Sequence, residues 1–301
     1  MILLDLVFAL FLAGLSAAAA ALAMMYAIRW YDLSVKRFNP DMMWLDAILE
    51  RGWRPFRTYL AELFHMLVYA ILFILGMAGW LAGRRGSIPA GKNTAAGAPL
   101  IVLVHGLMGR GANMWLLRWR LSIRGLKNIA IHDYASTHGD FREQQDKLRD
   151  FVAEAAQRTG SSGVILIGHS MGGLIAHGYA CEYEDQRGGV KALVTLGSPM
   201  RGSRMSALGL SGAARAMHPS NPYFTSVVAR RPAAAFVCIG SVYDQLVIPF
   251  TNAGHPMADR FELTDGVGHA GLLYSGEAFG HVMQCLREAL QPAEEEAQEK
   301  D

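Results

Sequence analysis

Residues 164–183 constrain the fold of this chain more than any other segment. They begin with the apolar run VILI, continue with the G-x-S-x-G pattern GHSMG, and end in a helical stretch that starts at Met171. In GHSMG, Gly168, His169 and Gly172 surround Ser170. A strand that turns this sharply into a helix strains the serine backbone and brings neighbouring backbone close, which favours glycine at both flanking positions. The pattern therefore predicts a strand–turn–helix that presents the Ser170 hydroxyl above a sheet.

The rest of residues 100–291 alternates apolar runs of strand length with helical patterns. The runs LIVLVHG, NIAIHDY, ALVTLGSP and AAFVCIGS are typical of strands buried on both faces. Residues 141–159 have helical spacing with mixed charge on the other face. We therefore expect one α/β domain over residues 100–291, with a mostly parallel sheet flanked by helices.

A serine hydroxyl becomes a nucleophile only beside a base that an acid orients. The predicted base is His269, in GVGHA after the expected last strand (260–264) and before the expected final helix (277–290). His281 falls inside that helix, and His255 precedes the strand. The predicted acid is Asp244, just beyond the run AAAFVCIG, with Asp265 as the alternative on the same loop as the histidine.

Acyl transfer also needs two backbone N–H groups that stabilise a developing oxyanion. We expect one from Met171, directly after the serine, and the other from Leu107, in the turn HGLMG after the first strand. His105 in the same turn is expected to brace it.

Four segments together carry a resemblance: VHGLMG, LIGHSMGGLIA, TLGSPMRGS and GVGH. Over residues 99–290 the chain resembles the bacterial triacylglycerol lipases and esterases of the α/β-hydrolase superfamily. The resemblance implies carboxylic-ester hydrolysis, with Ser170, Asp244 and His269 as triad and Leu107 and Met171 as oxyanion donors. The chain departs from those lipases at Met200, where histidine is usual, and at His177, where arginine is common.

No cofactor and no metal ion is expected. No aspartate pair matches the structural calcium site of some of these lipases, and the cysteines do not match their disulfide. The three cysteines are widely spaced, with no CxxC pair. The net charge of +2 gives no strong field for nucleic acid.

The N-terminal third is unlike the rest of the chain. Residues 6–28 and 63–83 carry no charge, and each run is long enough to cross a hydrocarbon core of roughly 30 Å. We therefore predict a membrane anchor over residues 1–86 with two transmembrane helices. The segment between them, rich in Trp, Tyr and basic residues, is expected at the membrane interface, with an amphipathic helix near 42–51. A cleaved signal peptide ending near 16–21 and a soluble helical hairpin are the alternatives.

Three further segments are distinguished by composition. Residues 87–99 (SIPAGKNTAAGAP) are expected to form a linker, and residues 292–301 a disordered acidic tail. The insertion at 200–232, with scattered apolar residues and two prolines, is either a mobile lid over an acyl pocket or plain packing against the sheet.

These features predict a membrane-anchored serine ester hydrolase that acts on acyl-lipid esters through an acyl-enzyme. An acyltransferase, thioesterase or amidase would share the same triad, and a catalytically idle scaffold is a further alternative. The segment between the membrane runs carries six Lys and Arg, against three after the second run. Because basic residues are retained on the cytoplasmic side, this bias predicts a multi-pass protein of a bacterial inner membrane with a periplasmic catalytic domain.

Overall fold

The computed structural model describes residues 2–36, 54–83, 86–89, 98–137, 140–183 and 189–290. The predicted interfacial helix at 42–51, most of the predicted linker, and the tail at 292–301 lie outside the described residues.

A six-stranded sheet forms the centre of the molecule. Its strands run in the order β2-β1-β3-β4-β5-β6, and every neighbouring pair is parallel. This confirms the predicted parallel sheet. The strands are β1 (Leu100–Val104), β2 (Ile129–His132), β3 (Val164–His169), β4 (Val190–Leu196), β5 (Ala235–Ser241) and β6 (Arg260–Thr264).

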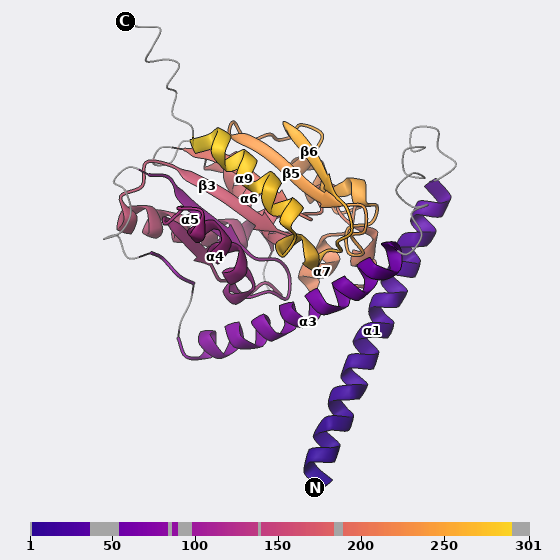
Figure 1. The fold of residues 1–301 in the computed structure, drawn as a ribbon. Coiled ribbons are helices and arrows are strands. Elements are labelled where there is room, and N and C mark those ends of the chain that lie inside the picture. Colours follow the sequence, from indigo (N-terminus) through magenta and orange to yellow (C-terminus); the bar gives the residue numbers. More distant parts are fainter. Residues whose placement is uncertain are drawn as a thin grey trace, which may run out of the picture.

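Helices cover both faces of the sheet (Figure 1). Helices α5 (Phe141–Thr159) and α6 (Met171–Glu182) pack on one face, while α4 (Trp115–Ile123) and α9 (Gly276–Leu290) pack on the other. Successive side chains of a strand point to opposite faces. Accordingly, Val102 and Val104 join the core under α5 and α6, whereas Ile101 and Leu103 join the core under α4 and α9.

The boundaries of α5 follow from local chemistry. The Asp140 side chain accepts a hydrogen bond from the Glu143 N–H at 2.7 Å, which satisfies a free donor at the start of the helix. At the other end Gly160 adopts a left-handed φ of 66°, a conformation that glycine adopts without strain. The helix therefore begins and ends where the sequence predicts.

The insertion at 200–232 folds into η4 (Arg204–Leu208), α7 (Gly212–Ala216) and α8 (Tyr223–Val228). Met217, Phe224 and Val227 are buried in the core shared with α5 and α6. This is the packing that the second interpretation predicted. Movement of the insertion as a lid stays a prediction. A short helix, η5 (Phe250–Ala253), follows β5.

Two long helices precede the sheet, α1 (Ile2–Lys36) and α3 (Arg54–Leu81). Figure 1 shows α3 running along one edge of the α/β domain, with α1 crossing near its start. Helix α3 begins nine residues before the expected 63, with Pro55 in its first turn, where its fixed φ and missing N–H cost nothing. Among the described residues, Pro55–Leu81 is the one stretch long and apolar enough, by length and composition, to cross a membrane.

Helix α3 contacts the domain along its length, at η6 (Ala270–Leu273) near its start and at η3 (Gly111–Met114) further along. The Glu62 carboxylate accepts from the Ala270 N–H at 2.7 Å, and the Tyr69 carbonyl accepts from Asn113 Nδ2 at 2.8 Å. The C-terminal half of α1 also contacts the domain, because Arg29 Nε donates to the Val242 carbonyl at 2.8 Å.

These contacts differ from the predicted anchor. In a two-span topology the bilayer would separate residues 29–62 from the domain that follows α3. Yet Arg29 and Glu62, at the two ends of that segment, both bind the domain. The structure therefore does not support two crossings in this order. An uncharged run in the sequence does not show which face of α3 binds protein, so these contacts could not be predicted from it.

The start of the predicted linker is also fixed in place. Ser87 forms an isolated antiparallel bridge with Ile131 of β2, with N–H···O distances of 3.1 and 2.9 Å. Ile88 packs against the core next to it. Residues 87–89 are therefore part of the domain edge and not a free linker.

Candidate active site

The site lies where the strand order reverses. From β1 the chain continues to β2 on one side and then returns to β3 on the other, which is the point of an open α/β sheet where ligand sites commonly form. The turn after β1 packs directly on the turn after β3, since a Cβ on Gly106 would lie 2.7 Å from the Cβ of Ser170. This brings the predicted oxyanion turn against the predicted nucleophile.

Ser170 occupies a strained turn between β3 and α6, with φ 55° and ψ −129°. A Cβ on Gly172 would collide with the Val104 and His105 carbonyls, which explains the need for glycine there. Within the described chain, the non-glycine residues with a left-handed φ are Ser170 and Met108, in the turns after β3 and β1. Such strain persists where the surroundings impose it, commonly at functional sites.

Asp244 and His269 meet at the end of the sheet. Asp244 Oδ2 lies 2.8 Å from His269 Nδ1, and the carboxylate is fully buried. Its Oδ1 accepts from the N–H groups of Leu246 and Val247, both at 2.8 Å. Asp265 is exposed, and its backbone N–H donates to a glutamate of α9. The geometry thus favours Asp244 over Asp265 as the partner of His269.

His269 also lies beside the serine turn. The ring of His169, the residue before Ser170, has its centroid 4.9 Å from that of His269, and its Nε2 is 3.1 Å from the His269 carbonyl. The structure therefore brings all three predicted triad residues together at the carboxyl-terminal ends of the strands.

The imidazoles of His269 and His169 differ in pKa because their surroundings differ. Burial opposes protonation of His269, but the charge of Asp244, its hydrogen bond and the charge of Glu62 together raise the pKa of His269 above its usual value. Burial, with the nearby His269, lowers the pKa of His169 to about 3. Of the two neighbours, His269 is the one suited to accept a proton near neutral pH.

Three further predicted residues lie in or next to the turns after β1 and β3, and their roles stay predictions. Met171 is buried at the first position of α6, where backbone N–H groups point out of the helix. Leu107 lies in the turn after β1. His105 donates from Nδ1 to the Gly106 carbonyl at 2.9 Å and accepts from the Tyr134 N–H at Nε2, which agrees with a bracing role.

Two residues of the site were missed by the sequence analysis. The Glu62 carboxylate accepts from Ala270 N (2.7 Å), Gly271 N (2.9 Å) and Gln245 Nε2 (2.9 Å). Gln245 Oε1 in turn accepts from the His269 N–H at 3.0 Å. In the sequence, Glu62 stands out only as a lone carboxylate directly before an uncharged run. Its hydrogen-bond donors lie 183 or more residues away along the chain, so the sequence does not reveal them.

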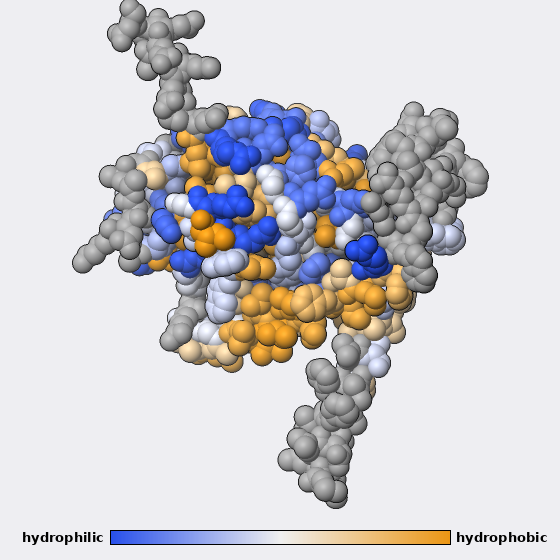
Figure 2. Space-filling model, viewed as in Figure 1, coloured by the Kyte–Doolittle hydropathy of each residue, from blue (hydrophilic) through white to orange (hydrophobic). Residues whose placement is uncertain are grey.

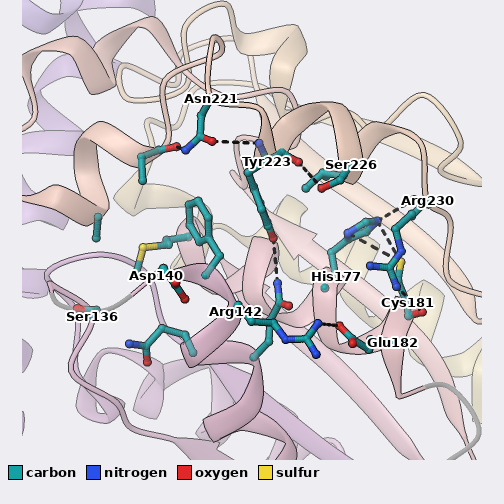
Figure 3. A pocket seen from close by; sticks show the side chains of 18 residues that line it. Ser136, Asp140, Arg142, His177, Cys181, Glu182, Asn221, Tyr223, Ser226 and Arg230 are labelled. Atoms are coloured by element: carbon teal, nitrogen blue, oxygen red, sulfur yellow. Dashed lines mark hydrogen bonds and ion pairs between the residues drawn. The ribbon is translucent and has the colours of Figure 1, made fainter.

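A cavity of about 390 Å³ lies between α5, α6 and the insertion (Figure 3). Its lining combines apolar side chains such as Phe141 and Val227 with charged ones such as Arg142, and Met171 brings it next to the serine turn. At one side of the cavity His177 donates from Nε2 to the Arg230 carbonyl at 3.2 Å. Ser170 and His269 do not line this cavity. The cavity reaches the serine turn only at Met171.

No arrangement of metal ligands is apparent in the part of the chain that the structure describes: it holds no group of three or more His, Cys, Asp and Glu side chains suited to a metal ion. All three cysteines are free thiols.

Comparison with known proteins identifies the fold. Residues 99–236 match a family model described as alpha/beta hydrolase fold. The chain is similar to Bacillus licheniformis lipase BlEst2 in mature form, at 17% identity and a TM-score of 0.54, over 67% of this chain and 96% of that one. It is also similar to Aspergillus fumigatus lipase B, at 14% identity and a TM-score of 0.52, over 65% of this chain and 54% of that one. No curated protein is significantly similar in sequence. The chain therefore has the α/β-hydrolase fold.

Proposed function

We propose that this chain of the α/β-hydrolase fold is a serine ester hydrolase, a lipase or esterase, with Ser170, His269 and Asp244 as its catalytic triad. The observation that carries the proposal is the 2.8 Å contact between buried Asp244 and His269 beside the strained Ser170 turn. An acid that orients an imidazole next to a serine on a sharp turn is the arrangement that activates a hydroxyl.

In the proposed mechanism Ser170 Oγ attacks the ester carbonyl carbon while His269 Nε2 takes the hydroxyl proton. Asp244 stabilises the imidazolium and holds Nδ1 as a donor. The oxyanion accepts hydrogen bonds from the N–H groups of Leu107 and Met171. His269 then protonates the leaving alcohol, and water activated by the same imidazole releases the acid from the acyl-enzyme.

The proposed substrate is an acyl-lipid ester. The cavity beside Met171 has a mixed polar and apolar lining and reaches the residue that follows the serine, which leaves room there for an acyl chain. The long apolar helix α3 favours a membrane-associated enzyme, and two of the structures with the same fold are named as lipases. Transfer of the acyl group to another acceptor, or cleavage of a thioester or amide, would use the same residues.

Labelling with a fluorophosphonate, followed by rates on esters and phospholipids of graded chain length, tests the proposal. Ser170→Ala should abolish labelling and lower kcat by about 10⁴-fold or more. His269→Ala should do nearly as much, and the double variant scarcely more, because the residues act as a unit. A Ser170→Ala protein with near wild-type turnover would refute the serine-hydrolase mechanism, and an idle scaffold would not be labelled at all.

A further inference from the structure

Helix α3 has polar side chains on the face toward the enzyme and apolar side chains on the face toward solvent. Polar groups of α3 are buried, since Thr58 is inaccessible and Glu62 binds the enzyme, and the guanidinium of Arg110 lies 4.6 Å from the centre of the inward-facing Trp80 ring. A helix on a soluble domain normally buries its apolar face and exposes its polar one. In α3 this order is reversed.

The outward face of α3 is a continuous apolar stripe. Its large side chains are exposed, Phe64 and Ile74 by 62% and 65%. At 3.6 residues per turn they fall within about 120° of the helix circumference and extend for about 37 Å. Figure 2 shows the corresponding apolar surface along the edge where α3 runs in Figure 1. The stripe consists of Phe56, Leu60, Phe64, Leu67, Ile71, Ile74, Leu75 and Leu81.

Charge and neighbouring residues identify the partner. Arg57 is exposed near the start of α3, next to the first residues of the stripe. Directly after η3, α4 exposes Trp115 and Trp119. An exposed apolar stripe that begins beside an arginine, on a domain that also exposes tryptophans, matches the chemistry of a lipid–water interface with anionic headgroups.

The stripe also lies beside the proposed catalytic site. A Cβ on Gly109 would collide with the Tyr69 hydroxyl of α3, so the oxyanion turn touches this helix. Met108 in that turn is 64% exposed. We propose that α3 lies flat on a bilayer surface, with its apolar stripe in the lipid and the catalytic site at the membrane. This inference rests on the proposed lipid substrate, but the orientation of α3 is tested without any turnover.

Depth measurements on the full chain in vesicles of phosphatidylcholine and phosphatidylglycerol distinguish the two orientations. Spin labels are placed on Leu60→Cys, Leu67→Cys and Ile74→Cys in a Cys181→Ser background, since Cys238 and Cys285 are buried. In a flat helix all three labels report one shallow depth. In a crossing helix, labels seven residues apart differ by about 10 Å.

A matched label on Arg158→Cys, exposed on α5, should stay in water. A depth gradient along α3 would overturn the proposal in favour of a crossing. Three labels exposed to water in the presence of vesicles would overturn the proposal, because the stripe would then face solvent. Labels that are shielded in a dimer without lipid would also overturn it, because the partner would then be a second copy of the chain. Hydrolysis of a water-soluble ester by the labelled proteins reports separately on the triad.

The inward face of α3 also binds the loop that carries His269. The buried Glu62 carboxylate binds the two N–H groups that follow His269 and, through Gln245, the N–H of His269 itself. The sequence around the histidine makes room for it, because a Cβ on Gly268 would collide with the carboxylate and one on Gly271 would lie 3.0 Å from Oε2. The geometry points to Glu62 as a positioning residue that holds the imidazole of His269 in place.

The charge of Glu62 acts on the same imidazole. The groups that face His269 are Asp244 from the loop after β5, His169 from β3 and Glu62 from α3, with His65 3.6 Å from Glu62. Glu62→Gln keeps the shape but removes the negative charge and one acceptor. A misplacement of the base by 1 Å costs about 100-fold, so we expect kcat to fall by about 10-fold to 100-fold with KM little changed.

The pH profile separates positioning from mere stability. Loss of the Glu62 charge should move the acid limb of kcat/KM to lower pH, because that charge helps to keep the His269 imidazole protonated. Gly268→Ala, which crowds the same carboxylate from the other side, should lower kcat without that shift. Glu154→Gln, an exposed change on α5, serves as control. A Glu62→Gln enzyme with unchanged kcat and pH profile but a lower Tm would overturn the inference.

Discussion

Asp244→Asn is the substitution that most sharply tests the proposed triad. Asp244 Oδ1 is held by two backbone N–H donors at 2.8 Å, so an asparagine at this position keeps its oxygen there and turns its NH₂ toward His269 Nδ1. That NH₂ can only donate, which makes Nδ1 an acceptor and leaves the proton on Nε2. The imidazole is then in the wrong tautomer to accept the proton of Ser170.

The expected loss follows from that tautomer. A serine hydrolase with a misprotonated base loses about 10⁴-fold in kcat, equivalent to about 5.5 kcal/mol of transition-state stabilisation. Stability should change little, by about 1 kcal/mol or a fall of about 2–4 °C in Tm, because both backbone hydrogen bonds survive. Turnover of a chromogenic ester and thermal unfolding by circular dichroism measure the two effects. Asp265→Asn should be mild, and reversed effects of the two variants would refute the assignment of the acid.

Three further outcomes are expected. Since Asp244 and Glu62 raise the pKa of His269 and the base works only when deprotonated, kcat/KM should fall with decreasing pH through a midpoint above that of an ordinary imidazole; a midpoint below it would contradict the geometry. Rates should favour medium or long acyl chains and rise at lipid interfaces, whereas equal rates on acetyl and decanoyl esters would indicate a small fixed pocket. Because Arg29 and Glu62 both bind the enzyme, these two residues lie on its side of any membrane. The periplasmic assignment of the enzyme stays a prediction, and absence of alkaline phosphatase activity from a fusion after Asp301 would contradict it.

The sequence by itself determined the sheet and the turn that carries Ser170. Buried parallel strands appear as continuous apolar runs, and a sharp strand–helix turn needs glycine next to the serine, so both are properties of a few neighbouring residues. For the same reason α5 begins at Phe141 and ends at Thr159 as predicted. The order of serine, acid and histidine along the chain was equally local, because each follows its own strand.

Only the tertiary structure decided which groups meet. Asp244 and Asp265 were both plausible acids until the end of β5 brought one of them to 2.8 Å from His269. The role of α3 was hidden for a similar reason, because hydropathy averages over all faces of a helix, while its function depends on which face meets the enzyme. Glu62 and Ala270 are 208 residues apart, and nothing local to either residue predicts that the carboxylate of one binds the N–H of the other.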